Sequence, residues 1–271
     1  ERVGAVYRIA VKGEQFDARP LMKSAFSPST GSPAMGQDFD IDLKIASLIG
    51  FNSEILKSAD IRAQLRGGLV RDLKLAGNLA KQAVAGQMAK GEKGEPVIVL
   101  ESADAGALLR FTDIYRKMNA GSMMLVLSAS GEPLIGKVTI RNFALLEESA
   151  IEGALTQPGG GEGTAIVTDP KNVQFNRLKA EFSAASGRVT LKDATMWGTV
   201  LGGTLEGTID YPKDMVDLRG TFVPAYLVNN FFNKIPLLGE LLGGANEGIF
   251  AVTFSVSGPV AAPSVNSTRF L

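Results

Sequence analysis

Three aspartates, Asp38, Asp40 and Asp42, occupy every second position and have the spacing closest to that of a metal-binding loop. A calcium-binding EF-hand loop also needs a glycine, a distal glutamate and flanking helices. Apolar residues separate the aspartates here, and this alternation is typical of a half-buried strand. We therefore expect the three carboxylates to lie on the solvated face of a strand, and we predict no metal site.

Glu147, Glu148 and Glu152 are the residues that could supply the carboxylate pair of a hydrolase. Nothing in the sequence around them predicts the raised pKa that a general acid needs near neutral pH. The chain has no histidine and no cysteine, which excludes a Ser-His-Asp triad, thiolate catalysis and disulfide bonds. We predict that the protein is not an enzyme, with no catalytic residues and no cofactor.

Glycine-rich segments could bind phosphate, and the strongest candidate is the run at 159–163. No Gly-Lys-Ser or Gly-Lys-Thr follows this run, so it is not a P-loop. The pair at 202–203 connects two expected strands, whereas a dinucleotide fingerprint leads from a strand into a helix. We interpret both segments as turns or loops.

The composition excludes some classes of partner. The 271 residues include 45% hydrophobic residues, enough for a large core or an apolar surface. Lys and Arg total 28, as do Asp and Glu, so the formal net charge is zero. Proteins that bind nucleic acid need a basic surface, so we expect no nucleic-acid partner. The sequence also has no polybasic segment of the kind that binds anionic membranes.

Period-two alternation of apolar and polar residues dominates the chain and predicts strands. The alternation is clearest at 38–45, 205–211, 216–222 and 250–256. Further strands are predicted at 5–12, 69–79, 83–89, 96–101, 122–128, 134–145, 173–184 and 188–196. Short turn signals between these segments favour an antiparallel meander with one wet and one dry face. Within 173–184 the alternation changes phase between Phe175 and Leu178, which predicts a β-bulge.

Helical patterns interrupt the strands. At 103–117 the apolar residues share one helix face, and Ser102 is the expected N-cap. A shorter helix is predicted at 144–155, and 16–25 could add a further helical turn. The segment 224–242 begins with a proline and is broken by a second one, so it is too interrupted to span a bilayer. It could be a core helix, a lid over a groove or an interfacial anchor, and we favour a core helix or a lid.

Two segments rich in Ser, Pro and Gly, 27–37 and 157–163, are expected to be flexible. The second one divides the chain into an N-terminal part at 1–156 and a C-terminal part at 164–271, each with strands and helical segments. Glu1 is not a methionine, and the sequence has neither a signal peptide nor a run of 18 apolar residues. We therefore expect that this is part of a longer protein, with any targeting segment or membrane anchor outside it.

The predicted fold is mainly β: an elongated, curved antiparallel sheet that forms a hydrophobic groove, with a few short amphipathic helices. Periodicity alone leaves a second possibility open, a β-sandwich in which two sheets bury each other's apolar faces. In a groove the dry face would contact lipid. The residues predicted to line it are Ile41, Leu43, Phe182, Leu191, Ile209, Leu218, Phe222, Phe250, Val252 and Phe254.

The C-terminal part resembles the AsmA-like superfamily, which includes the TamB-related and YhdP-like envelope proteins. The resemblance lies in GRVTLKDATMWGTVLGGTLEGTIDYPKDMVDLRGTFVPAYLVNNFFNKIPLLGELLGG and in EGIFAVTFSVSGPVAAPSV. Upstream, FDARPLM, SADAGALLRFTDIY and IRNFALLEES are also similar to the C-terminal module of the YhdP-like branch, so most of the chain is covered. In such proteins we would expect a proline and further residues after Asn266, where this chain reads STRFL and ends.

This resemblance implies a function in lipid transport and outer-membrane biogenesis. The family's β-grooves are anchored at the inner membrane and move phospholipids or related lipids towards the outer membrane. For this chain the resemblance implies a periplasmic location and acyl chains as ligands, with a membrane at one or both ends of the full-length protein. An envelope protein partner is also possible. The competing hypothesis is a non-catalytic assembly module with a filled core and a protein partner.

Overall fold

The computed structural model describes residues 2–3, 6–26, 37–149, 151–152, 169–224, 251–260 and 262–270, and these form one mainly β structure. Two short helices, α1 (Arg19–Phe26) and α2 (Ala105–Phe111), accompany the strands. The strands are β1 (Arg2–Val3), β2 (Val6–Asp17), β3 (Asp38–Ile49), β4 (Ile55–Arg66), β5 (Leu69–Leu79), β6 (Gln82–Lys90), β7 (Pro96–Ser102), β8 (Met118–Ser128), β9 (Leu134–Leu146), β10 (Asn172–Ala185), β11 (Arg188–Trp197), β12 (Leu201–Asp210), β13 (Met215–Pro224), β14 (Ala251–Gly258) and β15 (Ser264–Phe270).

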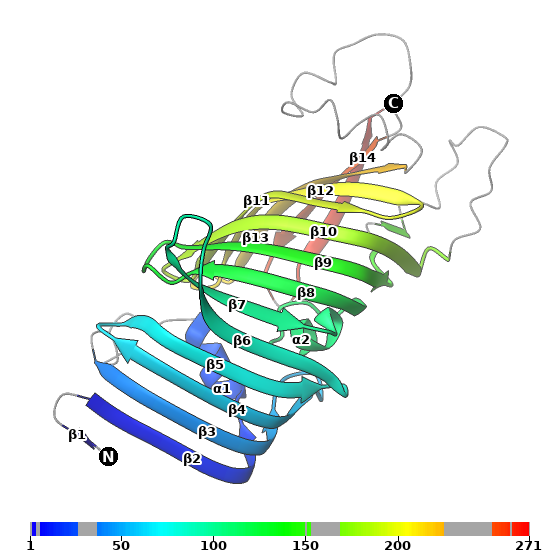
Figure 1. Ribbon diagram of the computed structural model, residues 1–271. Helices are drawn as coiled ribbons and strands as arrows, with labels where there is room; N and C mark the ends of the chain where they lie inside the picture. Colours follow the sequence, from blue (N-terminus) through cyan, green and yellow to red (C-terminus); the bar gives the residue numbers. More distant parts are fainter. Residues whose placement is uncertain are drawn as a thin grey trace.

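All of these strands join one open, curved sheet of 15 strands, in the order in which they occur along the chain (Figure 1). Figure 1 shows the strands stacked from β2 at one end of the sheet to the C-terminal strands at the other. The prediction of a mainly β, elongated and curved sheet is confirmed. The described strands form a single sheet, so no second sheet packs against it as in a β-sandwich.

The sheet is mixed rather than wholly antiparallel, which corrects one part of the prediction. Strands β2 and β3 are parallel, from Val6 opposite Asp38 to Asp17 opposite Ile49, whereas every other neighbouring pair is antiparallel. Parallel neighbours need a connection that runs back along the length of the strands, from the end of one to the beginning of the next. The segment between β2 and β3, which contains α1, makes this connection.

The two faces of the sheet differ in polarity, as the alternation predicts. One face, which we call the inner face, carries the buried hydrophobic cluster that includes Ile45, Phe143 and Phe254. Helix α2 contributes Leu108 and Phe111 to this cluster, and Met22 of α1 packs against it. The opposite, outer face carries charged residues such as Asp40 and Lys44, and these residues alternate with the apolar ones.

Residues with positive φ mark the positions where strands change phase. In β4, Leu56 and Ala59 are both buried although three positions separate them, and Ser58 between them has a φ of 53°. In β9, Asn142 has the same φ. Because one residue at such a site does not follow the alternation, the apolar side chains on both sides of it can point to the same face. The inner face therefore stays apolar along the length of these strands.

The phase change predicted in 173–184 is present, but it is not a bulge against β9. Phe175 pairs with Phe143, and Leu178 pairs with Ile140, without a shift in register. Both strands thus change phase together. The register of β10 does shift against β11, a little further along the strand.

The helices are shorter than predicted. Helix α2 covers only residues 105–111 of the predicted 103–117, and its N-cap is Asp104, whose carboxylate accepts the Ala107 N–H at 2.9 Å. The Ser102 hydroxyl instead donates to the Asp104 carbonyl oxygen at 2.8 Å. The left-handed conformation of Asp113, with a φ of 59°, prevents the helix from continuing.

Two other helix predictions also need correction. Residues 16 and 17 belong to β2, and α1 begins at Arg19. Residues 144–146 extend β9, so the only described helical residues of 144–155 are 149 and 151–152. Residues 27–36 and 157–163 and the body of 224–242 lie outside the described residues. Strands β9 and β10 pair across the proposed division of the chain, so one sheet includes both parts.

Candidate lipid-binding face

Apolar residues on the inner face line up in rows that cross the strands. In the first row, each residue is the cross-strand partner of the next, from β2 to β10. Of its nine members, six are half-buried, Val11 is exposed, and Gly86 and Ala180 are buried.

 The members of this first row are Val11, Leu43, Ile61, Leu75, Gly86, Leu100, Leu125, Val138 and Ala180.

A second row crosses the sheet from β6 to β15. Like the first row, it contains no charged residue. Its members are again successive cross-strand partners, and all but one of them are half-buried. These members are Met88, Ile98, Leu127, Gly136, Phe182, Leu191, Gly207, Leu218, Val256 and Val265. Together the two rows make a continuous apolar surface across β2 to β15.

Most of the predicted lining residues lie on this face and are half-buried. Phe182, Leu191 and Leu218 belong to the second row, and Leu43 belongs to the first. Ile41, Ile209 and Val252 are half-buried neighbours on the same face. Phe250 lies outside the described residues.

Phe222 and Phe254 are more deeply buried than the rest of the predicted lining, with 3% and 8% of their surfaces exposed. Their rings stack with a centroid distance of 4.6 Å. Each ring lies close to a glycine of the preceding strand. A Cβ added at Gly220 would lie 2.3 Å from Phe254 Cζ, and one added at Gly203 would lie 2.9 Å from Phe222 Cδ1. These two phenylalanines therefore belong to the packed core rather than to an accessible surface.

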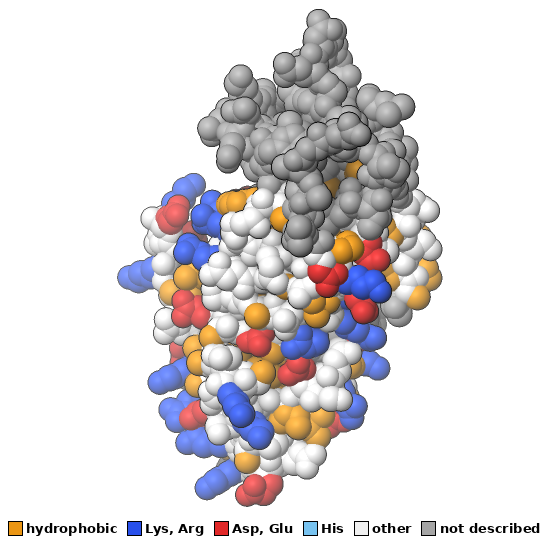
Figure 2. Space-filling view, turned by 90° about the vertical axis from the view of Figure 1, so that its right-hand side faces the viewer, with side chains coloured by type: hydrophobic (Ala, Val, Ile, Leu, Met, Phe, Trp, Pro, Cys, Tyr) orange, Lys and Arg blue, Asp and Glu red, His pale blue; other side chains and the backbone are white. Residues whose placement is uncertain are grey.

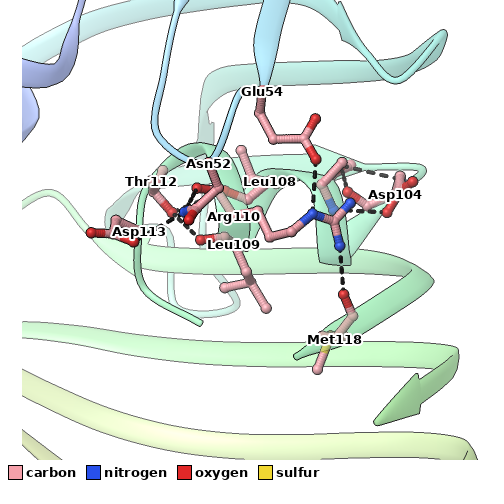
Figure 3. Close-up of polar contacts among 11 residues, drawn as sticks. Asn52, Glu54, Asp104, Leu108, Leu109, Arg110, Thr112, Asp113 and Met118 are labelled. Carbon is pink, nitrogen blue, oxygen red and sulfur yellow. Dashed lines mark hydrogen bonds and ion pairs between the residues drawn. The ribbon is translucent and has the colours of Figure 1, made fainter. Parts of the chain in front are cut away.

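Helix α2 covers the inner face at one end of the strands, where a network of polar contacts holds it (Figure 3). Arg110 donates from Nε to the Glu54 carboxylate at 2.8 Å and from Nη1 to the Met118 carbonyl oxygen at 2.7 Å. Asn52 donates to the Arg110 carbonyl oxygen at 2.9 Å and to the Asp113 carboxylate at 3.0 Å. The loop between β3 and β4 is thereby tied to α2 and to the start of β8.

The carboxylates considered as a hydrolase pair have structural partners in the same region. Glu148 accepts a hydrogen bond from the Tyr115 hydroxyl at 2.7 Å and lies 3.5 Å from the Lys117 ammonium group. Burial, together with the negative charge of Glu148, raises the pKa of the Tyr115 phenol well above its usual value. The Lys117 ammonium group also donates to the Glu147 carbonyl oxygen at 2.9 Å. These contacts fasten the end of β9 to the segment that follows α2.

On the outer face, two of the three aspartates with alternating spacing bind cationic side chains or backbone. Asp40 lies 2.6 Å from the Arg66 guanidinium and 3.8 Å from that of Arg8, and Asp38 accepts the Gly67 N–H at 2.9 Å. In the part of the chain that the structure describes, no group of three or more acidic side chains is arranged to hold a metal ion. Figure 2, which views the molecule from the right-hand side of Figure 1, shows Lys and Arg side chains close to Asp and Glu side chains, with hydrophobic side chains in small groups between them.

Sequence reasoning missed the part of the inner face that β4 supplies, including Ile61 and Leu65. The period-two pattern of Ile61, Ala63 and Leu65 was an available signal, but the irregular spacing of Leu56 and Ala59 around Ser58 hides the strand. Among the described residues, no helix is both long enough and apolar enough to cross a bilayer. Comparisons with protein-family models, curated proteins and solved structures find no match for this chain.

Proposed function

We propose that the inner face of the sheet binds the acyl chains of lipids and conducts them across the strands, between the inner and outer membranes of a Gram-negative envelope. The observation that carries this proposal is the pair of uncharged, mostly half-buried apolar rows that cross the sheet from β2 to β15. A filled core would bury such residues completely, whereas a surface that receives a ligand leaves them partly accessible.

The dimensions of the second row suit an acyl chain. Ten strands have nine gaps of about 4.8 Å, so the row extends over roughly 43 Å. The acyl region of one leaflet is only about 15 Å thick, half of the hydrocarbon thickness of a bilayer. One row could therefore accommodate an extended acyl chain in several successive positions.

The energy of lipid transfer explains why such a surface must be continuous. Removing a chain of about sixteen carbons from a bilayer costs on the order of 12 kcal/mol, at roughly 0.8 kcal/mol for each methylene group. A conduit has to offset most of this cost at every position. Since the rows contain no charged residue, we expect affinity to depend on the acyl chain and to differ little between head groups.

The proposed location follows from the family resemblance together with this surface. The protein would be periplasmic, as part of a longer chain anchored in the inner membrane, with a membrane at one or both ends and an envelope protein as a further partner. It would act without catalysis or a cofactor, since binding and conduction need only apolar contact.

Mass spectrometry of lipid extracted from the purified protein tests this proposal. Leu125→Gln and Leu218→Gln place a polar group in the first and second rows, and we expect both variants to remain folded and to retain several-fold less lipid. Val126→Gln and Arg219→Gln are matched controls, because each changes the adjacent residue on the outer face of the same strand. Thermal unfolding of all four variants checks that they are folded.

Unchanged lipid content in both row variants would contradict the proposal. Wild-type protein that carries no lipid, and takes up none from vesicles, would instead favour the alternative of an assembly module with a protein partner. Strong retention of one head-group class, with acyl chains matched, would contradict the expected dependence on the acyl chain.

A further inference from the structure

The outer face has a cluster of basic residues that is separate from the apolar rows. Arg141 of β9 and Arg177 of β10 are directly opposite each other as cross-strand partners, and Lys179 lies two positions further along β10. The adjacent residue Leu178 packs against the buried cluster of the inner face. Because successive side chains of a strand point to opposite faces, Arg177 and Lys179 lie on the outer face. We call Arg141, Arg177 and Lys179 the outer basic cluster.

Several cations of the outer face have a carboxylate partner. Lys137, for example, lies 2.9 Å from the Glu181 carboxylate. Among the described residues, no ion pair or hydrogen bond is found for the side chains of the outer basic cluster. Their other cross-strand neighbours are Ser122, Thr139, Thr195 and Trp197, all uncharged.

Two arginines directly opposite each other on a sheet repel one another. Ordinarily a neighbouring carboxylate relieves such repulsion, and no described carboxylate contacts this pair. A bound anion would relieve it equally well. The arrangement therefore has an electrostatic cost in the free protein that a ligand of negative charge would remove.

The Arg177 side chain is also held in place. Its Cζ lies 5.7 Å from the ring centroid of Trp197, the only tryptophan in the chain. Its Nε is buried and has no hydrogen-bond partner among the described residues. A guanidinium that is stacked on a ring and partly removed from water loses less freedom and less hydration when it binds an anion.

We propose that the outer basic cluster is a binding site for a phosphate group. Two guanidinium groups present planar sets of donors, which match the oxygens of a phosphate, and the Lys179 ammonium group adds a third positive charge. The phosphate could belong to a soluble molecule or to a lipid head group, since both present the same oxygens. This site lies on the face opposite the apolar rows, so it does not depend on the proposed acyl binding.

Titration of the purified protein with inorganic phosphate, followed by calorimetry and by thermal unfolding, tests the site. We expect saturable binding, with a rise in the unfolding temperature, and we expect Arg141→Gln and Arg177→Gln each to weaken binding at least tenfold. In phosphate-free buffer of low ionic strength, Arg141→Gln should unfold at the same temperature as the wild type or higher, because the repulsion is gone. Lys137→Gln is the matched control and should bind phosphate like the wild type.

A second arm distinguishes the source of the phosphate. Flotation with vesicles of phosphatidylcholine alone, and with added phosphatidic acid, shows whether a lipid head group is bound in preference to free phosphate. Recruitment that needs phosphatidic acid and both arginines supports a lipid source, and phosphate binding without recruitment supports a soluble one. If neither probe binds, or if the arginine variants bind both probes like the wild type, the proposal is overturned.

Discussion

At the scale of single residues, Phe222 and Phe254 show how closely core and surface adjoin on the inner face. Both share the face of Leu218, which is half-buried, yet their stacked rings are almost fully enclosed. Glycines in the preceding strands leave the space that these rings occupy. The glycines therefore allow both rings to pack closely against the backbone of the sheet.

Phe222→Asp should destabilise the protein strongly, because it would place an unpaired carboxylate in the buried cluster. The expected loss is several kcal/mol, comparable with the total stability of many domains. Thr221→Asp, on the opposite face of the same strand, should have a small effect. Thermal or urea unfolding measures both variants. Equal stability of the two variants would mean that Phe222 is not part of the packed core.

Two strand glycines provide a second comparison. A Cβ at Gly220 would lie 2.3 Å from Phe254 Cζ and 2.5 Å from the Thr204 carbonyl oxygen, whereas one at Gly13 would have only Ile45 Cδ1 nearby, at 4.0 Å. Gly220→Ala should therefore cost about 1–3 kcal/mol through overpacking. Gly13→Ala should be neutral or slightly stabilising. Urea unfolding of the two variants checks this, and a neutral Gly220→Ala would contradict the packing described.

At the scale of elements, α2 is held by an ion pair that is largely enclosed. Arg110 and Glu54 have 24% and 16% of their side chains exposed. Glu54→Ala removes the carboxylate that Arg110 Nε binds, and the expected cost is about 1–3 kcal/mol. Glu181→Gln removes half of an exposed ion pair with Lys137, and its effect should be too small to resolve. Similar unfolding midpoints for the two variants would mean that α2 needs no such anchor.

Strands with regular alternation could be predicted from the sequence almost to the residue, as 69–79 shows for β5. Strand β4 was missed because the phase change at Ser58 gives Leu56 and Ala59 a spacing that is not that of a strand. Strand β15 was missed because its sequence, SVNSTRF, has few apolar residues. The ends of α2 depend on Asp104 and on the left-handed Asp113, whose conformations local periodicity does not reveal.

The inner face could be predicted for the same reason, since period two places alternate residues on one side. What periodicity could not provide is the depth at which each residue lies. Phe182 and Phe222 have similar sequence contexts, yet Phe182 is half-buried and Phe222 is enclosed. Depth depends on what packs above each residue, and this comes from elements distant in the sequence.

At the scale of the whole molecule, the sheet has an open edge along β2. Strand β1 covers only Val6 and Tyr7 of that edge, and no described strand pairs with it from Arg8 to Asp17. In hydrogen exchange, the β2 amides that point away from β3 should exchange orders of magnitude faster than those of β9 and β10, which have neighbours on both sides. Equal protection of all β2 amides would show that another strand covers the edge.

The order of the strands also has a consequence for folding. Each strand pairs with the strands that precede and follow it in the chain, as in a repeat protein whose stability is a sum of nearest-neighbour terms. Contacts therefore form mainly between consecutive strands, which allows the ends of the sheet to unravel independently. The bond from Asn52 to Arg110 closes a loop of 58 residues and makes β3 to β8 unfold more nearly as one unit. Denaturation should accordingly proceed inward from the ends of the sheet and reach strands β3 to β8 last.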